Sequence, residues 1–469
     1  MSTRFINRKK ELAWLDDSYK KAYDEGQLLI IYGKRRVGKT ELLKHFSQEK
    51  QSIYFVAEKG TAQDQLRTAK NIIADGLNDE LMRGVNFPSW RELFQYIGQK
   101  LEGRTDPLVL IFDEFPYLAE SDKGMSSYFQ IGWNEFLENK KVVTVLMGSS
   151  ISMMYEHVLL PSAPLYGRRT GQWILEPFNY VESKAFYPEA PFVNTFSLYA
   201  ITGGIPAYAK IFDGSKTLEE NIRQYVLPEG SFLSVEPELL LSEEFTEPRS
   251  YLSILKAIGL GRTKFSEIVS ATGLPVTAMP GYLQTLINLR LVKKEIPVTE
   301  KLPETSKKGS YSLADSFLRF YFSFVYPHNS LIKGGNVDAL FKQYGEVLQR
   351  LVAKSYEDAT EQFIVAAMSA EKLPHFNSLG RWWGNNTEID LVGLNEENNS
   401  ILFVETKWSN QLLRTDLLDD LKLKARAVVW GKPDRQEHFA LVSRAGFSDE
   451  LVQRAKAENV LLIQEDTVL

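Results

Sequence analysis

The side chains with the clearest chemical purpose lie in one eight-residue loop. Residues 33–40 are GKRRVGKT, preceded by the apolar run 28–32 and followed by a helical pattern from Glu41. A glycine-bounded loop between a strand and a helix points backbone N–H groups at a phosphate, and the helix N-terminus adds partial positive charge. In such a phosphate loop Lys39 would neutralise the β- and γ-phosphates of ATP, and Thr40 would hold Mg²⁺. The residues expected to contact the nucleotide are Gly33, Lys34, Arg35, Arg36, Val37, Gly38, Lys39, Thr40 and Glu41.

A pair of acids ends a second apolar run. Residues 108–115 are LVLIFDEF, which places Asp113 at the carboxyl end of a predicted buried strand and Glu114 next to it. In a phosphate-loop ATPase the first acid holds Mg²⁺ and the second activates the attacking water as general base. The pair therefore predicts hydrolysis of ATP as well as binding.

Three further residues could reach the γ-phosphate. Ser149 follows the predicted strand Val142–Met147, so its hydroxyl could sense the phosphate from a neighbouring strand. Arg168 or Arg169 could act as an arginine finger. The sequence leaves open which arginine acts, and whether it acts within one chain or on the next subunit of a homo-oligomer.

These residues need a scaffold of alternating strands and helices. Alternation of this kind predicts an α/β fold with a parallel sheet covered on both faces. The predicted strands are Leu28–Tyr32, Ser52–Ala57, Leu108–Asp113, Val142–Ser149 and Gln172–Leu175. We expect a P-loop ATPase core in 1–200, a helical lid and linker in 201–248, a winged helix in 249–325, and an α/β nuclease-like domain in 326–469.

Composition narrows the class of protein. The 469 residues are 44% hydrophobic and 25% charged, as in ordinary globular proteins. The net charge of −5 argues against a globally basic nucleic-acid binder, although 249–311 hold ten Lys/Arg against four Glu. The absence of cysteine excludes disulfides and thiolate zinc sites. No apolar run is long enough to span a bilayer and no signal-peptide pattern is present, so we expect a cytoplasmic protein with no membrane partner.

Residues 249–325 have the element order of a winged helix. Helical patterns cover Arg249–Leu260, Lys264–Thr272 and Val276–Leu289, and two strands, Leu291–Ile296 and Gly309–Leu313, follow. The third helix would read a DNA groove, and the lysines of the hairpin would meet phosphates. The side chains concerned are Thr277, Gln284, Thr285, Asn288 and Arg290, with Lys293, Lys294, Lys301, Lys307 and Lys308 on the hairpin. The alternative is an internal packing module that never touches DNA.

A second chemical site is predicted near the C-terminus. Asp390 lies on the predicted strand Glu388–Leu394, and Glu405 ends the strand Ile401–Glu405, with Lys407 two residues further on the same face. Two carboxylates can bind Mg²⁺ or Mn²⁺ at a scissile phosphate, and a lysine can activate water and stabilise developing charge. Glu357, or as second choice Glu361, would add an acid from the helical pattern Tyr344–Ala370. Ala425–Trp430 is predicted as another buried strand.

Several motifs together resemble a known family. Residues 1–240 contain FINRKKEL, YGKRRVGKT, IFDEF, MGSS, PLYGRRTGQ and ITGGIPAY, which are similar to archaeal-type ATPases of the STAND-like branch related to AAA+ proteins. The later regions, including GRWW before Asp390, resemble ATPases that carry the DUF234 domain, and Asp390 with Glu405-x-Lys407 resembles the PD-(D/E)xK nucleases. The resemblance implies that Arg8 and Glu11 lie near the adenine, that Ser149 is the sensor, and that Arg168 or Arg169 is the finger. Asn7 departs from the usual glycine of the family, and Ile389 from the usual proline.

Taken together, the sequence predicts a Mg²⁺-dependent ATPase whose hydrolysis is coupled to DNA binding and to metal-dependent DNA cleavage. The alternative is a nucleotide-controlled switch or scaffold with an inactive nuclease-like domain. A helicase is disfavoured, because no helicase motifs accompany the phosphate loop and Asp113-Glu114.

Overall fold

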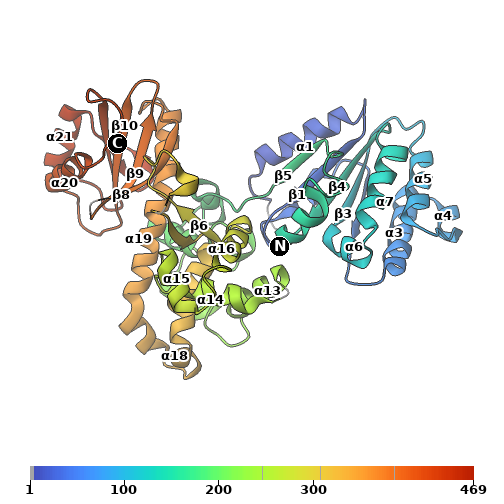
Figure 1. The fold of residues 1–469 in the computed structure, drawn as a ribbon, viewed down its shortest axis with the longest axis horizontal. Coiled ribbons are helices and arrows are strands. Elements are labelled where there is room, and N and C mark those ends of the chain that lie inside the picture. Colours follow the sequence, from blue (N-terminus) through green and yellow to red (C-terminus); the bar gives the residue numbers. More distant parts are fainter. Residues whose placement is uncertain (1–4, 246, 307, 385) are drawn as a thin grey trace. The chain divides into compact units, whose positions relative to one another are not determined.

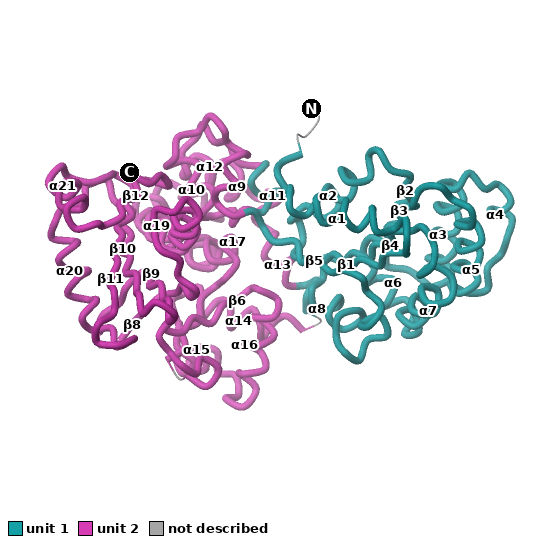
Figure 2. Tube along the Cα trace, turned by 90° about the horizontal axis from the view of Figure 1, so that it is seen from above, with its two compact units in different colours: residues 1–178, 205–210, 242–246 teal, residues 179–204, 211–241, 247–469 magenta. Residues whose placement is uncertain are grey.

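The computed structural model describes residues 5–245, 247–306, 308–384 and 386–469. They form two compact units, coloured separately in Figure 2. The first unit comprises residues up to Phe178 together with 205–210 and 242–246, and the second comprises 179–204, 211–241 and 247–469. The predicted boundaries of four domains remain a prediction.

A five-stranded parallel sheet forms the centre of the first unit, as predicted. Its strand order is β2-β3-β4-β1-β5, so β3 and β1 lie on either side of β4. Every residue of the three central strands is buried, which explains their continuous apolar sequences. The strands are β1 (Gln27–Tyr32), β2 (Ser52–Val56), β3 (Leu108–Asp113), β4 (Val142–Gly148) and β5 (Gly171–Ile174).

Helices cover both faces of this sheet (Figure 1). Leu15 of α1 and Leu43 of α2 pack with Leu29 and Ile31 of β1, whereas Leu28 and Ile30 face the core lined by α3, α5, α6 and α7. Alternate residues of one strand thus enter two different cores. The helices are α1 (Lys9–Lys21), α2 (Lys39–Phe46), α3 (Ala62–Leu77), α4 (Glu80–Gly84), α5 (Trp90–Lys100), α6 (Phe115–Ser121), α7 (Met125–Gly132), α8 (Ile151–Met154) and α11 (Pro206–Ala209).

The second unit begins with helices and a short hairpin. Helices α14 (Pro248–Gly259), α15 (Phe265–Thr272) and α16 (Met279–Asn288) precede the antiparallel strands β6 (Val292–Glu295) and β7 (Ser310–Leu313). Helix α16 starts later than predicted, because 275–278 form a turn closed by Ala278 N–H donating to the Pro275 carbonyl. The other helices are α9 (Tyr180–Ser183), α10 (Phe192–Thr202), α12 (Leu218–Tyr225), α13 (Phe232–Glu244), α17 (Ser316–Phe320) and α18 (Asn329–Lys333).

A six-stranded mixed sheet completes the second unit, with order β13-β12-β11-β10-β9-β8. Leu402 and Val404 face α19 (Val337–Ser369), whereas Ile401 and Phe403 face α20 (Thr415–Ala425) and α21 (Asp449–Glu458). The strands are β8 (Ser378–Gly384), β9 (Thr387–Asn395), β10 (Ser400–Lys407), β11 (Gln436–Ser443), β12 (Leu461–Gln464) and β13 (Thr467–Val468).

The predicted strand Ala425–Trp430 is wrong. Helix α20 extends to Ala425, and a turn follows in which Val429 is 91% exposed. The Arg435 guanidinium donates to the carbonyls of Ala425, Val428 and Trp430, so this backbone needs no strand partner. The strand beside β10 is instead β11, which pairs with it in parallel.

Candidate functional site

The phosphate loop joins the carboxyl end of β1 to α2. Gly33 and Gly38 adopt φ values of +154° and +95°, and a Cβ on Gly33 would lie 2.3 Å from the Leu175 carbonyl oxygen. Glycine is therefore required there. The Lys39 ammonium donates to the carbonyls of Gly33 and Lys34, each at 2.9 Å, and so spans the loop that a phosphate would occupy.

Charges around Lys39 are arranged to receive an anion. Burial lowers the pKa of Lys39 to about 8, while the carboxylates of Glu114, Asp113 and Glu244 act in the opposite direction. A buried ammonium with few permanent partners favours a negatively charged ligand. The loop, its glycines and this lysine fit a nucleotide phosphate.

Asp113 ends β3 beside the start of α2, as its predicted role requires. Its Oδ2 accepts hydrogen bonds from the Thr40 hydroxyl at 3.2 Å and the Tyr54 hydroxyl at 2.6 Å. Burial, the largest influence, raises its pKa, and Tyr54 opposes that rise. Thr40 and Asp113 are thus adjacent oxygen ligands of the kind that Mg²⁺ binds. Sequence reasoning missed Tyr54, a polar-tipped residue near the carboxyl end of β2.

Glu114 and Ser149 meet directly. Glu114 has φ +51° and caps α6, and its carboxylate accepts from the Ser149 hydroxyl at 2.6 Å and from the Ser149 N–H at 3.2 Å. The structure therefore joins the expected general base to the expected sensor.

Two glutamates of the segment 242–246, which sequence reasoning also missed, lie in the first unit. Glu243 forms an ion pair with Arg35 of the phosphate loop. Glu244 accepts from the Ser152 hydroxyl at 3.0 Å, the Ser150 hydroxyl at 3.3 Å and the Ile151 N–H at 3.3 Å. Glu243 lies more than two hundred positions from Arg35 and Glu244 about ninety from Ser152, so no local spacing signals their approach.

Arg8 contacts the phosphate loop, and Glu11 is paired with Arg8. Arg8 is buried, donates to the Val37 carbonyl at 2.8 Å and to Glu11 at 3.0 Å, and lies over the Phe178 ring. These contacts fix the loop conformation, and proximity to the adenine remains a prediction.

The two candidate finger arginines differ in environment. Arg168 is exposed, whereas Arg169 is half-buried over the Tyr166 ring and its Nη1 is buried with no hydrogen-bond partner among the described residues. The choice between them stays open.

In the second unit, the carboxyl-lysine cluster is assembled from β9 and β10. The antiparallel register ends with Leu391 opposite Val404, so Asp390 and Glu405 are the next residues on each strand. Asp390 accepts from the Thr406 N–H at 2.9 Å, and burial, with Glu405 and Glu357 nearby, raises its pKa to about 6.

The two carboxylate oxygens of Glu405 have different surroundings. Oε1 accepts from the Lys407 ammonium at 2.7 Å and from Lys424 of α20 at 3.1 Å. Oε2 is buried with no partner among the described residues, and the side chain is 5% exposed. An unpartnered buried carboxylate oxygen fits a cation ligand. The sequence analysis did not predict the contact of Lys424, because Lys424 lies on α20 and not on the strands that carry the other residues.

The helix acids of α19 lie at the edge of this cluster. Glu357 pairs with Lys354 at 2.9 Å and is close enough to raise the pKa of Asp390, whereas the charges that act on Glu361 are Lys293 and Asp358. Within the described ranges, no group of three or more His, Asp or Glu residues could hold a metal ion. The cluster therefore offers two carboxylates and two lysines.

Some hairpin lysines are already paired. Lys293 contacts Glu295 at 3.1 Å and Asp358 of α19 at 3.4 Å, and Lys308 contacts Glu300 at 2.5 Å. Gln284 and Asn288 of α16 are exposed and hydrogen-bonded to each other at 2.9 Å. Lys307 lies outside the described residues.

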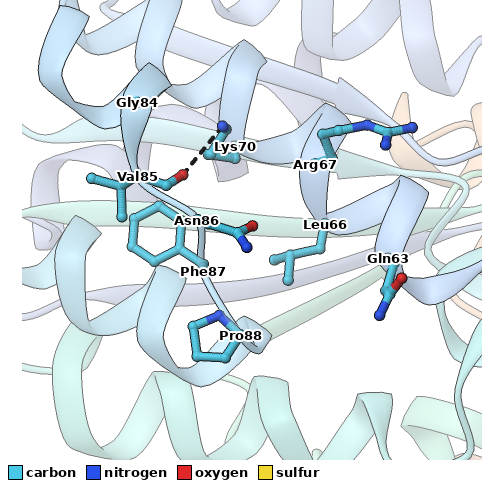
Figure 3. A pocket seen from close by; sticks show the side chains of 9 residues that line it. All are labelled: Gln63, Leu66, Arg67, Lys70, Gly84, Val85, Asn86, Phe87 and Pro88. Carbon is cyan, nitrogen blue, oxygen red and sulfur yellow. Dashed lines mark hydrogen bonds between the residues drawn. The ribbon is translucent and has the colours of Figure 1, made fainter.

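A pocket of about 360 Å³ in the first unit is separate from the predicted site residues (Figure 3). Its floor includes Leu66 and Phe87, and Lys70 donates to the carbonyls of Arg83 and Val85 at 2.8 and 3.2 Å. The Lys70 ammonium is therefore hydrogen-bonded to the backbone beside the pocket. None of the helices in the described chain has the length and apolar character needed to cross a membrane.

Comparisons with known proteins match two separate parts of the chain. Residues 5–210 match an ATPase domain found predominantly in Archaea, and residues 321–420 match DUF234, described as archaeal and bacterial proteins of unknown function. An uncharacterised protein of Methanocaldococcus jannaschii is 31% identical over 452 residues, covering 94% of this chain and 95% of that protein.

A solved structure is also similar to this chain. The Walker-type ATPase of Pyrococcus abyssi is 21% identical, covers 68% of this chain and 96% of its own, and superimposes with a TM-score of 0.51, which shows a shared fold. Together with the phosphate loop, the match to the ATPase domain shows an ATP-binding ATP hydrolase. The chain belongs to the family of P-loop ATPases, predominantly archaeal, that carry a C-terminal DUF234 domain.

Proposed function

We propose that this ATPase acts on DNA and that its second unit cleaves phosphodiester bonds with a divalent metal ion. The observation that carries the proposal is the Glu405 carboxylate, with one oxygen held by two lysines and the other buried without a partner among the residues that the structure describes. Lys407 and Lys424 already pair the charge of Glu405, but its second oxygen is costly to bury unless a ligand such as a metal ion completes its coordination.

At the nucleotide site, each predicted residue has a role that its contacts support. Lys39 neutralises the β- and γ-phosphates, Thr40 and Asp113 hold Mg²⁺, and Glu114 removes a proton from the attacking water. Ser149, hydrogen-bonded to Glu114, fixes that carboxylate near the γ-phosphate. Bound Mg²⁺ would supply charge neutralisation across the phosphate oxygens.

At the second site, Asp390 and Glu405 would hold Mg²⁺ or Mn²⁺ against a scissile phosphate. The ion would supply Lewis-acid stabilisation of the phosphate charge. The Lys407 side chain is 40% exposed, so it can also orient water and stabilise the leaving oxygen. Glu357 would act from α19 through its influence on Asp390.

We assign 249–325 to a winged helix that places the enzyme on DNA. Its elements follow that order, and Gln284 and Asn288 are exposed on α16, where amide side chains can read base edges. The internal pairing of Lys293 and Lys308 limits the phosphate contacts that the hairpin can make. The DNA affinity expected from this region is therefore modest.

A second candidate is a nucleotide-controlled switch with an inactive nuclease-like domain. It is favoured by the occupation of Glu405 Oε1 by both Lys407 and Lys424, and by the lack of a three-acid group in the described part of the chain. In this case the second unit would bind DNA or a protein without cutting.

Cleavage of single-stranded, linear and supercoiled DNA, with Mg²⁺ or Mn²⁺ and with or without ATP, separates the two candidates. We expect Lys407→Ala to lose cleavage and Lys432→Ala, which removes an exposed lysine of the same unit, to keep it. Equal cleavage by Lys407→Ala, or none by the wild type while ATP is hydrolysed, would favour the switch.

A further inference from the structure

The segment 149–152, called the loop 149–152 below, follows β4, includes the first two residues of α8 and is held from two sides. On one side, Ser149 donates both its N–H and its hydroxyl to Glu114. On the other, residues 150–152 donate to Glu244, through the hydroxyls of Ser150 and Ser152 and the N–H of Ile151. One short loop thus connects two carboxylates that are 130 positions apart in the sequence.

The start of this loop is tightly packed. A Cβ on Gly148 would lie 2.6 Å from the Met154 sulfur and 2.7 Å from Pro116 Cδ, so the start of the loop packs tightly against α6. Glu114 caps α6 in the left-handed region at φ +51°. A displacement of residues 150–152 is therefore transmitted to Ser149 and to the Glu114 carboxylate rather than absorbed.

We propose that Glu244 is a positioning residue for ATP hydrolysis, which holds the loop 149–152 so that Ser149 aligns Glu114 with the attacking water. The inference rests on the proposed role of Glu114 as general base. Glu244 ends α13, whose residues 232–241 belong to the second unit while 242–244 belong to the first.

Three variants test the inference: Glu244→Gln, Glu114→Gln, and Glu247→Gln as a matched control on an exposed glutamate. Misplacing a catalytic group slightly is enough to cost about a hundredfold in rate. We expect Glu244→Gln to lower kcat about ten- to a hundredfold, with the KM for ATP not raised and the binding of a fluorescent ATP analogue no weaker, because the change also removes a negative charge that acts on Lys39. Glu247→Gln should turn over as the wild type does.

A double variant shows whether Glu244 acts through the loop. Ser152→Ala removes the shortest of its hydrogen bonds, so it should lower kcat less than Glu244→Gln, and the double variant should be no slower than Glu244→Gln alone. Additive losses, an unchanged kcat, or a raised KM with weaker nucleotide binding would overturn the inference. Full turnover by Glu114→Gln would instead refute the proposed base, whatever Glu244→Gln shows.

Discussion

Replacing Asp390 with asparagine should stabilise the protein while removing the metal-dependent activity of the second unit. The carboxyl is 7% exposed, and burial followed by the charges of Glu405 and Glu357 raises its pKa from 3.8 to about 6, against the opposing effect of Lys407. Each tenfold change in a protonation equilibrium corresponds to about 1.4 kcal/mol. Keeping Asp390 ionised therefore costs the folded protein about 3 kcal/mol.

The sign of the pH dependence follows from the raised pKa. Between about pH 4 and 6 the folded protein holds a proton on Asp390 that the unfolded chain releases, so stability falls as the pH rises through this window. Above it the cost is constant. Asparagine carries no charge and still offers an oxygen to the Thr406 N–H, so its advantage should reach at most about 3 kcal/mol at pH 8 and vanish below about pH 4.

Urea denaturation of the full chain at several pH values, without divalent metal, measures this difference. Asp416→Asn, the same change at an exposed aspartate of α20, controls for the substitution itself. Two results would refute the reasoning that burial of the ionised Asp390 carboxylate destabilises the folded protein. One is a stabilisation of the same size at pH 4 and pH 8, and the other is an Asp390→Asn variant that is less stable than the wild type at pH 8.

Three changes at the nucleotide site have simple outcomes. Lys39→Ala should abolish ATP turnover by removing the phosphate-neutralising ammonium, and a phosphate-release rate equal to the wild type would contradict its assignment. Glu114→Gln should bind a fluorescent ATP analogue normally but hydrolyse ATP slowly; undiminished turnover would mean that another group is the base. Tyr54→Phe removes a hydrogen bond to a charged carboxylate, worth about 1.5–3 kcal/mol, so it should raise the Mg²⁺ concentration needed for half-maximal hydrolysis about tenfold or more. An unchanged Mg²⁺ dependence would show that Tyr54 does not orient Asp113.

The first unit could be predicted well because its signals are local. The central strands β1, β3 and β4 are buried on both faces, so each appears as an unbroken apolar run, and the phosphate loop is a continuous motif. Asp113 and Glu114 follow one of those runs directly, so their position at the edge of the sheet was predictable from spacing alone.

The residues that sequence reasoning missed come from distant segments. Tyr54 reaches Asp113 across neighbouring strands, Glu244 reaches Ser152 from about ninety residues away, and Lys424 reaches Glu405 from a separate helix. The spacing of apolar and polar residues along the sequence does not predict such tertiary contacts.

The misplaced strand has a different cause. The run at 425–430 is apolar enough to resemble a strand, but Arg435 satisfies its carbonyls from beyond a turn. The true strand β11 begins with the exposed Gln436 and Glu437 and the half-buried His438, so its first half lacks a continuous apolar signal.

The central claim, that one chain joins ATP hydrolysis to metal-dependent DNA cleavage, is tested most directly by measuring both products in the same reaction. Wild type and Asp390→Asn would each be incubated with supercoiled plasmid, ATP, and Mg²⁺ or Mn²⁺, with released phosphate and new DNA ends counted together. We predict phosphate from both proteins and DNA ends from the wild type alone. Phosphate release without DNA ends from the wild type, at every metal concentration, would contradict the account.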